Sequence, residues 1–359
     1  MIDKILLAPY YWALRLRHLL YDRGVLKSVQ SPVPTISVGN VAVGGTGKTP
    51  HTEMLIRLLT EDLHVRAADV AVLSRGYMRK SKGFRIVTAD GTAAMFGDEP
   101  LQIKKKFPDI TVAVDKNRVE ACRMLAEGAT DPAGVSSPKA GLIILDDAMQ
   151  YRALKPSLSI CLIPFNRNPF KDRLLPFGRL RDLPGRISSA DIAIVTKCPA
   201  ELDPWERSKW TESLRTSEIL FTSLGYGAPV PVFSEGDPRY IHSPRVIIVS
   251  GIADDTPLAD HLSGTYKIVR RFRFGDHHNF SKGDIASISS AAERYPTAII
   301  ITTEKDAERM YDCSGIGAGL KERIFKVPVR PVFLTEEDSA RFAKAVGKVI
   351  SSQEPRSES

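Results

Sequence analysis

The chain has 359 residues, of which 43% are hydrophobic and 26% charged, as in an ordinary globular protein with room for two domains and a sizeable core. Its 50 lysines and arginines against 42 aspartates and glutamates give a formal net charge of +8, which suits an acidic partner such as nucleic acid, an anionic membrane surface or a phosphorylated substrate. The four cysteines are scattered without a C-x-x-C pair, which argues against a zinc site or a disulfide framework and fits a reducing cytoplasm: they are Cys122, Cys161, Cys198 and Cys313.

The first predicted element is a short apolar stretch at residues 5–14. Ten residues are too few to span a bilayer, and the stretch lacks the small-residue cleavage site of a signal peptide. Basic residues follow it at Arg15, Arg17, His18 and Arg23. This mixture is typical of a helix lying in a membrane interface, and a helix packed on the domain with solvated arginines is an equal alternative.

A phosphate-binding loop is predicted next. The β-branched run Thr35–Val38 indicates a buried strand, and Thr52–Leu59 indicates a helix. The loop between them contains the residues expected to bind a nucleotide: Gly44, Gly45, Thr46, Gly47, Lys48, Thr49 and Pro50. The glycines let backbone N–H groups point at an anion, Lys48 can reach the outer phosphates, and the Thr49 hydroxyl can ligate Mg²⁺. Ala42 stands where the usual pattern has its first glycine.

Strands and helices alternate along most of the chain. Strands are expected at Thr35–Val38, Val70–Leu73, Thr111–Val114, Leu142–Leu145, Ser159–Leu162 and Ile192–Val195, with helical patterns such as Arg118–Glu127 between them. A polar, proline-rich segment then runs from about Pro199 to Pro244, within which residues 229–233 could form an extended strand. A second alternating pattern has strands at Arg245–Ser250, Tyr266–Arg271 and Ala298–Thr302, and helices at Pro257–Leu262, Lys282–Tyr295 and Glu336–Ile350.

This order predicts an α/β fold. We expect a P-loop NTPase-like parallel sheet covered by helices on both faces, with a second, smaller α/β domain. The expected division is an N-terminal membrane-interface region at residues 1–30, a P-loop domain at 31–225, a linker at 226–244, a C-terminal α/β domain at 245–350 and a disordered tail at 351–359.

Acidic residues follow two of these elements. The apolar run Leu142–Leu145 ends in Asp146 and Asp147, as expected of a strand that delivers a carboxylate beside a phosphate loop, where it can hold Mg²⁺. An acidic turn after a strand is the plainer alternative. Asp98, in Gly-Asp-Glu-Pro, begins a helical segment and taken alone is a helix cap.

Histidines and arginines in loops are weaker signals. Adjacent His277 and His278 follow Asp276 and could ligate a metal or orient a carboxylate base, although a third ligand is not recognisable and a plain loop remains credible. Arginines beside glycine or proline can grip a phosphate, and are otherwise solvated charges: Arg75, Arg118, Arg179 and Arg181. Residues 302–307 lie where a strand becomes a helix, and can cap that helix or contact a nucleotide.

Taken together and in this order, the motifs resemble the tetraacyldisaccharide 4′-kinase family of lipid A biosynthesis. The matching segments run from about Val38 to Asp306: residues 38–50, 74–77, 97–100, 145–150, 175–181, 251–252, 276–278 and 303–306. The resemblance implies transfer of the γ-phosphate of ATP, with Mg²⁺, to the 4′-hydroxyl of a tetraacylated glucosamine disaccharide 1-phosphate. It also implies a peripheral protein on the cytoplasmic face of the bacterial inner membrane, without a nucleic-acid partner and without an evident obligate protein partner.

The resemblance assigns roles to individual residues. Lys48 would bind the triphosphate, and Thr49, Asp146 and Asp147 would form the metal site. Asp98 would accept the proton of the sugar hydroxyl, with His277 orienting or tuning it, and Asp146 and Lys48 would complete the catalytic set. Headgroup ligands would be Arg75, Arg118, Gln150, Arg179 and Arg181, and further nucleotide contacts would come from Glu304, Lys305 and Asp306. Ala148-Met149 and Tyr151 depart from the Gly-Phe and His that the family commonly has, which affects substrate detail.

Two other functions are compatible with the residues. One is a soluble P-loop kinase of a small metabolite, in which the N-terminal helix serves packing only. The other is a nucleotide-dependent switch or metal-delivery protein related to P-loop GTPases. Against a switch, Thr196-Lys197-Cys198-Pro199 is a poor approximation to the guanine-specific Asn-Lys-x-Asp motif.

Overall fold

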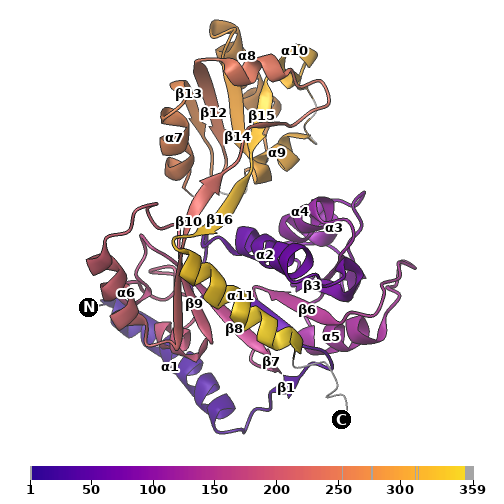
Figure 1. Ribbon diagram of the computed structural model, residues 1–359, viewed down its shortest axis with the longest axis vertical. Coiled ribbons are helices and arrows are strands. Elements are labelled where there is room, and N and C mark those ends of the chain that lie inside the picture. Colours follow the sequence, from indigo (N-terminus) through magenta and orange to yellow (C-terminus); the bar gives the residue numbers. More distant parts are fainter. Residues whose placement is uncertain (1, 253, 276–277, 312, 314, 352–359) are drawn as a thin grey trace. The chain divides into compact units, whose positions relative to one another are not determined.

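The computed structural model describes residues 2–252, 254–275, 278–311, 313 and 315–351. The chain divides into two compact units, Met1–Leu224 with Pro331–Ser359 and Gly225–Arg330. The chain leaves the first unit within strand β10 (Glu218–Tyr226) and returns to it within strand β16 (Val329–Phe333). The first unit is therefore built from two separate stretches of the sequence (Figure 1).

The first unit is built on a mainly parallel sheet. In the described part of the chain its strand order is β16-β10-β9-β8-β2-β6-β3-β5-β4. The strands not yet given are β2 (Thr35–Gly39), β3 (Val70–Ser74), β4 (Arg85–Ile86), β5 (Thr111–Val114), β6 (Leu142–Asp146), β8 (Leu158–Pro164) and β9 (Ile192–Thr196). The strands from β10 to β5 run parallel, and β4 is antiparallel to β5. Strands β2, β3, β5, β6 and β9 are buried along their whole length, as expected of parallel strands covered on both faces.

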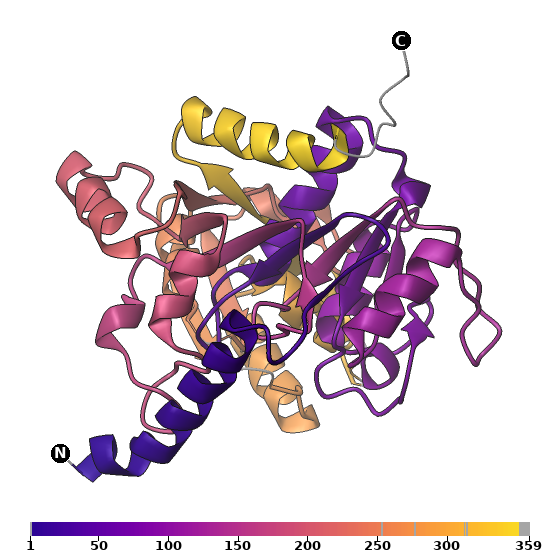
Figure 2. The same ribbon diagram turned by 90° about the horizontal axis from the view of Figure 1, so that it is seen from below.

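Helices cover both faces of this sheet. On one face lie α2 (Lys48–Arg57), α4 (Asp98–Lys106) and α11 (Glu336–Ser351), packed against the side chains of Val70 and Val72. The opposite face carries α5 (Arg118–Glu127), α6 (Pro204–Leu214) and part of α1 (Ile2–Asp22), packed against alternate residues such as Leu73 and Val195. Figure 2 shows α11 and α1 on opposite sides of the sheet. The short elements are β1 (Val29–Gln30), β7 (Leu154–Lys155), α3 (Ala93–Phe96), and turns of 3₁₀ or π helix at Leu58–Asp62, Ala67–Asp69, Pro169–Lys171 and Pro184–Ser189.

The second unit has its own sheet and core. Its described strands are ordered β11-β15-β14-β12-β13, parallel except for β11. They are β11 (Val230–Pro231), β12 (Arg245–Ser250), β13 (Lys267–Arg273), β14 (Ile299–Thr303) and β15 (Ile324–Val327). The helices are α7 (Thr256–Ser263), α8 (Lys282–Arg294), α9 (Glu304–Tyr311), α10 (Ala318–Lys321) and a 3₁₀ turn at Pro238–His242. Apolar side chains of α7 pack on one face, and those of α8 and α9 on the other.

The predicted α/β fold with a covered parallel sheet and a second α/β sheet is confirmed, but the expected division of the chain differs in two places. Residues 331–350, expected in the C-terminal domain, belong to the first unit, because β16 joins its sheet beside β10 and α11 buries Phe342 in its core. The expected linker at 226–244 contains β11, which pairs with β15 in the second sheet. Strand β10 lies in the segment that was expected to be polar and proline-rich, and it was not predicted because only its first half is buried. The expected tail lies outside the described residues except Ser351, which ends α11.

The place of α11 gives a stability prediction. Phe342 is 2% exposed and its ring lies 5.2 Å from that of Phe333. We expect Phe342→Ala to lower the unfolding free energy of the first unit by about 3–5 kcal/mol, through lost burial and the cavity left behind. All 3 tryptophans, Trp12, Trp205 and Trp210, lie in this unit, so urea titration followed by tryptophan fluorescence measures it. The exposed Lys344→Ala is the control, and an unchanged Phe342→Ala transition would contradict the assignment of α11.

Candidate active site

The phosphate loop, residues 40–47, connects buried strand β2 to helix α2. Gly44 and Gly47 have φ angles of 80° and 88°, which a side chain would strain, and Gly47 is the residue that precedes the first turn of α2. Helix α2 starts at Lys48, so its unpaired N–H groups and the positive end of its dipole face the loop. This is the arrangement that binds phosphate groups at a helix N-terminus.

Buried hydrogen bonds hold the loop in this shape. The Asn40 amide nitrogen donates to the Thr46 hydroxyl, and the Thr196 hydroxyl at the end of β9 donates to the Thr46 carbonyl at 3.0 Å. The Val43 N–H donates to the Arg179 carbonyl at 2.8 Å, so a second segment braces the loop from outside. Because these donors and acceptors are paired within the protein, the loop is ordered before a nucleotide arrives.

A buried histidine that sequence reasoning missed supports the end of the loop. His51 Nδ1 donates to the Gly47 carbonyl at 2.8 Å, and its Nε2 lies 3.0 Å from the Thr222 hydroxyl on β10. Burial lowers the pKa of His51 to about 4, against the opposing hydrogen bond to Gly47. The ring is therefore neutral at physiological pH and links the phosphate loop to the neighbouring strand. Its position directly after Gly-Lys-Thr-Pro was the available sequence signal.

Asp146 lies beside the loop because of the strand register. It ends β6, where it pairs with Val38 of β2, and it is 2% exposed. The Ser74 hydroxyl, at the end of β3, donates to Asp146 Oδ2 at 3.0 Å. Burial, with the nearby charges of Glu99 and Asp147, raises the pKa of Asp146 to about 7, despite Lys48 and Ser74. A buried carboxylate in this state is poised to take a cation.

Asp147 is held differently. It adopts a φ of 52°, and its Oδ2 lies 3.9 Å from Lys48 Nζ. Arg181 donates to both carboxylate oxygens of Asp147 and to the side chain of Asn40. Burial pushes the pKa of Asp147 upward, but the hydrogen bonds from Arg181 and the charges of Lys48, Arg181 and Arg118 outweigh it and leave that pKa below its ordinary value. The two neighbouring acids thus have opposite electrostatic environments.

Two of the expected headgroup ligands serve the Asp146–Gln150 turn itself. Arg118 is 3% exposed, and its Nη2 donates to the carbonyls of Asp146 and Asp147 at 3.0 Å each. Gln150 Nε2 donates to the Asn40 carbonyl at 2.6 Å. These contacts fix the acids relative to the phosphate loop, and they direct the Arg118 guanidinium at the main chain instead of at solvent. Arg75 and Arg179 are exposed, and with Arg181 they remain predicted headgroup ligands.

The departures from the family pattern have local explanations. The ring centroid of Tyr151 lies 5.4 Å from the Cζ atom of the Arg118 guanidinium, which is a cation–π contact. The Tyr151 hydroxyl donates to Asn117 Oδ1 at 3.3 Å. A Cβ on Gly39 would lie 2.8 Å from the Met149 Cβ, so Gly39 is required by the close approach of that side chain. Met149 packs in the core beside β8 and β9, as a phenylalanine would.

The donor set fits a magnesium ion. Mg²⁺ is usually held by one or two carboxylates, a hydroxyl and nucleotide phosphates, not by an all-protein cage. In the described part of the chain, a cluster of three or more His, Cys, Asp or Glu side chains suited to a metal is absent. Asp146 and Thr49 would supply the protein ligands, and the raised pKa of Asp146 reflects a buried negative charge that a cation would neutralise. Asp147 is bound by Arg181, and its expected part in the metal site stays a prediction.

Asp98 is the first residue of helix α4. Gly97 before it has a φ of 94°, and a Cβ there would lie 3.3 Å from the Tyr77 carbonyl oxygen, so the turn packs closely on the segment after β3. Asp98 is half-buried in the first turn, where the helix dipole stabilises a carboxylate. The charge of Glu99 raises the pKa of Asp146, because this end of the helix lies near that carboxylate.

Other predicted residues lie in the second unit. Asp306 is fully buried and accepts hydrogen bonds from the Gly251 N–H, the Thr303 hydroxyl and Arg309, so it orders the start of α9. Glu304 and Lys305 are partly exposed, and their contact with a nucleotide stays a prediction. His278 bonds to Asp284 at 2.9 Å and stacks on Phe274. Asp276 and His277 lie outside the described residues.

A phosphate loop, a helix N-terminus and a strand-end acid in a covered parallel sheet define a nucleotide-binding protein of the P-loop class. The family model described as "LpxK: Tetraacyldisaccharide-1-P 4'-kinase" matches residues 4–350. The chain belongs to this tetraacyldisaccharide-1-P 4′-kinase family, and it is an ATP-dependent kinase.

Similar proteins and a solved structure belong to the same kinase family. Tetraacyldisaccharide 4′-kinase of Phocaeicola vulgatus is 40% identical over 331 residues, covering 90% of this chain and 87% of that protein. The Bacteroides thetaiotaomicron enzyme is 37% identical, covering 96% and 92%. The crystal structure of LpxK from Aquifex aeolicus in complex with ATP matches with a TM-score of 0.69 at 26% identity, over 98% of this chain and 100% of that one.

The environment of His51 predicts acid-dependent stability. Its folded pKa of about 4 lies below its ordinary 6.5, so the unfolded chain binds a proton in this range that the folded chain excludes. Stability is therefore lost as pH falls from 6.5 towards 4, by about 2 kcal/mol between about pH 7 and about pH 5. We expect His51→Gln to remove this part of the pH dependence in urea titrations. His242→Gln, at an exposed histidine, is the control; equal pH slopes for wild type and His51→Gln would refute the assignment.

Proposed function

We propose that this kinase uses its phosphate loop, the Asp146–Gln150 turn and Asp98 to phosphorylate the 4′-hydroxyl of a tetraacylated glucosamine disaccharide 1-phosphate in lipid A biosynthesis. The observation that carries the proposal is the pairing of β2 with β6, which puts a buried carboxylate beside an ordered phosphate loop. Phosphoryl transfer has a loose transition state, so catalysis depends mainly on positioned groups and on stabilised charge. The geometry supplies both.

Each part has a distinct task in this proposal. The N–H groups of the loop and Lys48 bind the outer phosphates of ATP, and Lys48 is kept in place by Asp147. Asp146 and Thr49 hold the Mg²⁺ that accompanies ATP, which neutralises charge on the phosphates when bound. Arg75, Arg179 and Arg181 are proposed to contact the sugar headgroup and its phosphate.

Asp98 is the proposed general base. Asp146 is closed to solvent and bonded to Ser74, whereas Asp98 is half-buried at the open end of α4. Asp98 accepts the proton of the 4′-hydroxyl while the oxygen of that hydroxyl forms a bond to the γ-phosphorus of ATP. The bond between the γ-phosphorus and the oxygen that bridges it to the β-phosphate breaks, which releases ADP. The orienting role of His277, which lies outside the described residues, is kept as a prediction.

The exposed residues of helix α1 support the proposal that the enzyme binds a membrane surface. Trp12, Leu16 and Leu19 are 60%, 56% and 41% exposed and follow each other at helical spacing, so they form an apolar stripe on the outside. Leu14 packs on the opposite side, against the core beside β8 and β9. The two sequence alternatives for this helix, packing and interfacial, are therefore compatible. None of the described helices is long and apolar enough to cross a bilayer.

A groove beside α1 supports a lipid substrate. Its apolar walls come from the helix and from the segment that also carries Arg179 and Arg181: Leu7, Ala8, Tyr11, Trp12, Leu174, Leu180, Leu183 and Pro184. Asp172 and Arg173 add the polar part of its lining. We place acyl chains here, with the enzyme peripheral on the anionic cytoplasmic face of the inner membrane, which suits a net charge of +8.

The first test is transfer of labelled γ-phosphate from ATP to tetraacylated disaccharide 1-phosphate in mixed micelles with Mg²⁺. We expect wild type to form the doubly phosphorylated lipid, and Lys48→Ala to lose about 10²-fold or more in kcat/KM. Asp98→Asn should lose about 10²–10⁴-fold in kcat with little change in KM for ATP, because only proton transfer is affected. Near-wild-type turnover of Asp98→Asn would exclude it as the base, and folded wild type that binds ATP without forming lipid product would favour a soluble acceptor or a switch.

The second test concerns membrane binding. We expect Trp12→Ala to weaken sedimentation with vesicles of phosphatidylglycerol and phosphatidylethanolamine by about fivefold or more, from the lost apolar burial. Trp205→Ala is the matched control, since Trp205 is 68% exposed and belongs to α6, not to the apolar stripe of α1. Equal binding of wild type and Trp12→Ala would show that α1 does not contact the membrane through this stripe.

A further inference from the structure

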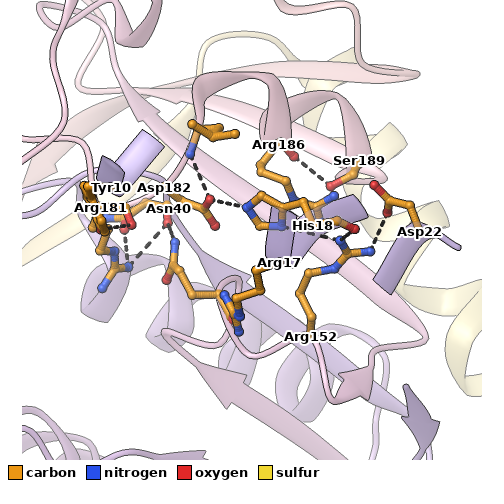
Figure 3. A network of polar contacts seen from close by, with 12 residues as sticks. Tyr10, Arg17, His18, Asp22, Asn40, Arg152, Arg181, Asp182, Arg186 and Ser189 are labelled. Carbon is orange, nitrogen blue, oxygen red and sulfur yellow. Dashed lines mark hydrogen bonds and ion pairs between the residues drawn. The ribbon is translucent and has the colours of Figure 1, made fainter. Parts of the chain in front are cut away.

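The side of α1 opposite the apolar stripe is bonded to the active-site segments (Figure 3). We propose that His18 is a positioning residue for phosphoryl transfer, which makes α1 a part of the catalytic framework as well as a membrane helix. His18 Nε2 lies 2.6 Å from Asp182 Oδ1. His18 is 5% exposed and Asp182 is fully buried.

The two nitrogens of the His18 ring face different partners. Arg152 Nη1 donates to the His18 carbonyl at 3.0 Å and lies 3.4 Å from Nδ1, so Nδ1 faces a donor. Nε2 faces a carboxylate, which only accepts. The ring therefore donates at Nε2 to Asp182, and its Nδ1 lies beside the Arg152 guanidinium. Arg152 also bonds to Asp22 at 2.7 Å, which ties the last turn of α1 to the same place.

Asp182 depends on His18. Its Oδ1 accepts from His18 and from the Leu183 N–H at 2.8 Å, while its Oδ2 is buried without a hydrogen-bond partner among the described residues. A buried carboxylate with so few partners is costly once its main side-chain partner is removed. Loss of His18 therefore favours movement of Asp182 towards water.

A movement of Asp182 would also displace Arg181, the adjacent residue, which bonds to Asp147. The Arg181 and Asp182 N–H groups both donate to the Val41 carbonyl, near the start of the phosphate loop. Arg181 in turn bonds to Asp147 and Asn40 with its guanidinium. A shift of the 181–182 main chain consequently moves the partner that holds Asp147 beside Lys48.

Two further residues of α1 reach the same segments. The Tyr10 hydroxyl donates to the Arg181 carbonyl at 3.2 Å. Arg17 Nη2 donates to the Gln150 carbonyl at 2.8 Å, and Gln150 donates to the Asn40 carbonyl. One helix thus bonds to both segments that converge on Asn40. Partners of this outer kind commonly change metal affinity or activity by about 10–100-fold when removed, and small displacements of catalytic groups are costly in rate.

The test compares His18→Leu, which removes both ring contacts, with His18→Gln, whose amide can donate and accept in their place. We expect His18→Leu to lose about tenfold or more in kcat at saturating lipid, with vesicle binding unchanged. His18→Gln should recover to within about threefold of wild type, because it restores the contact to Asp182. His242→Leu and His242→Gln, at an exposed histidine of the second unit, are the matched controls.

A purely structural role is separated by two further measurements. Activity is expressed per folded molecule from urea titration, and the Mg²⁺ concentration for half-maximal binding of a fluorescent ATP analogue is measured without lipid. We expect that concentration to rise about fivefold or more in His18→Leu. Unchanged values per folded molecule, or equal losses in both variants, would overturn the proposal. Because the kcat readout rests on the proposed lipid substrate, wild type without lipid product would refute that function alone, while the Mg²⁺ measurement would still decide the role of His18.

Discussion

The structure depends on one buried charge held next to an anion-binding loop. The parallel pairing of β2 with β6 places Asp146 beside Val38, where burial raises the pKa of the carboxyl to about 7. A carboxylate in such a place is unfavourable until a cation joins it, and the phosphate loop brings a triphosphate that itself requires a cation. Asp146 and the triphosphate of ATP would therefore share one metal ion in the proposed site. The surrounding residues follow from the need to position this pair.

Asn40 is the residue on which the neighbouring segments converge. Its side chain donates to Thr46 in the phosphate loop and accepts from Arg181, and its carbonyl accepts from Gln150. Networks of this kind stiffen a site when every member is paired, because each bond orients the next. Asn40 thereby keeps the phosphate loop, the Asp146–Gln150 turn and Arg181 in one arrangement. Helix α1 bonds to the outer side of the same network, so the helix proposed to face lipid is connected to the site.

Family membership and the site geometry decide among the three functions that the residues allowed. The chain matches the kinase family over residues 4–350, and the solved relative was crystallised with ATP. A switch protein would not need an apolar groove beside α1, and a soluble kinase would not need an exposed stripe of Trp12, Leu16 and Leu19. These features are consistent with a lipid acceptor, because its acyl chains and its phosphorylated headgroup require apolar and cationic surfaces side by side.

The local features of the protein could be predicted from the amino-acid sequence. Strands such as Thr111–Val114 and Arg245–Ser250 were predicted at their observed bounds, and the phosphate loop and Asp146 were found, because apolar runs, glycines and strand-end acids act over a few neighbouring residues. Features that depend on residues far apart in the sequence could not be predicted and are known only from the structure. Residues 331–351 belong to the first unit, Arg118 donates to the main chain of Asp146, and His18 bonds to Asp182, 164 positions away. Such contacts are set by packing and burial, which leave no short-range pattern in the sequence.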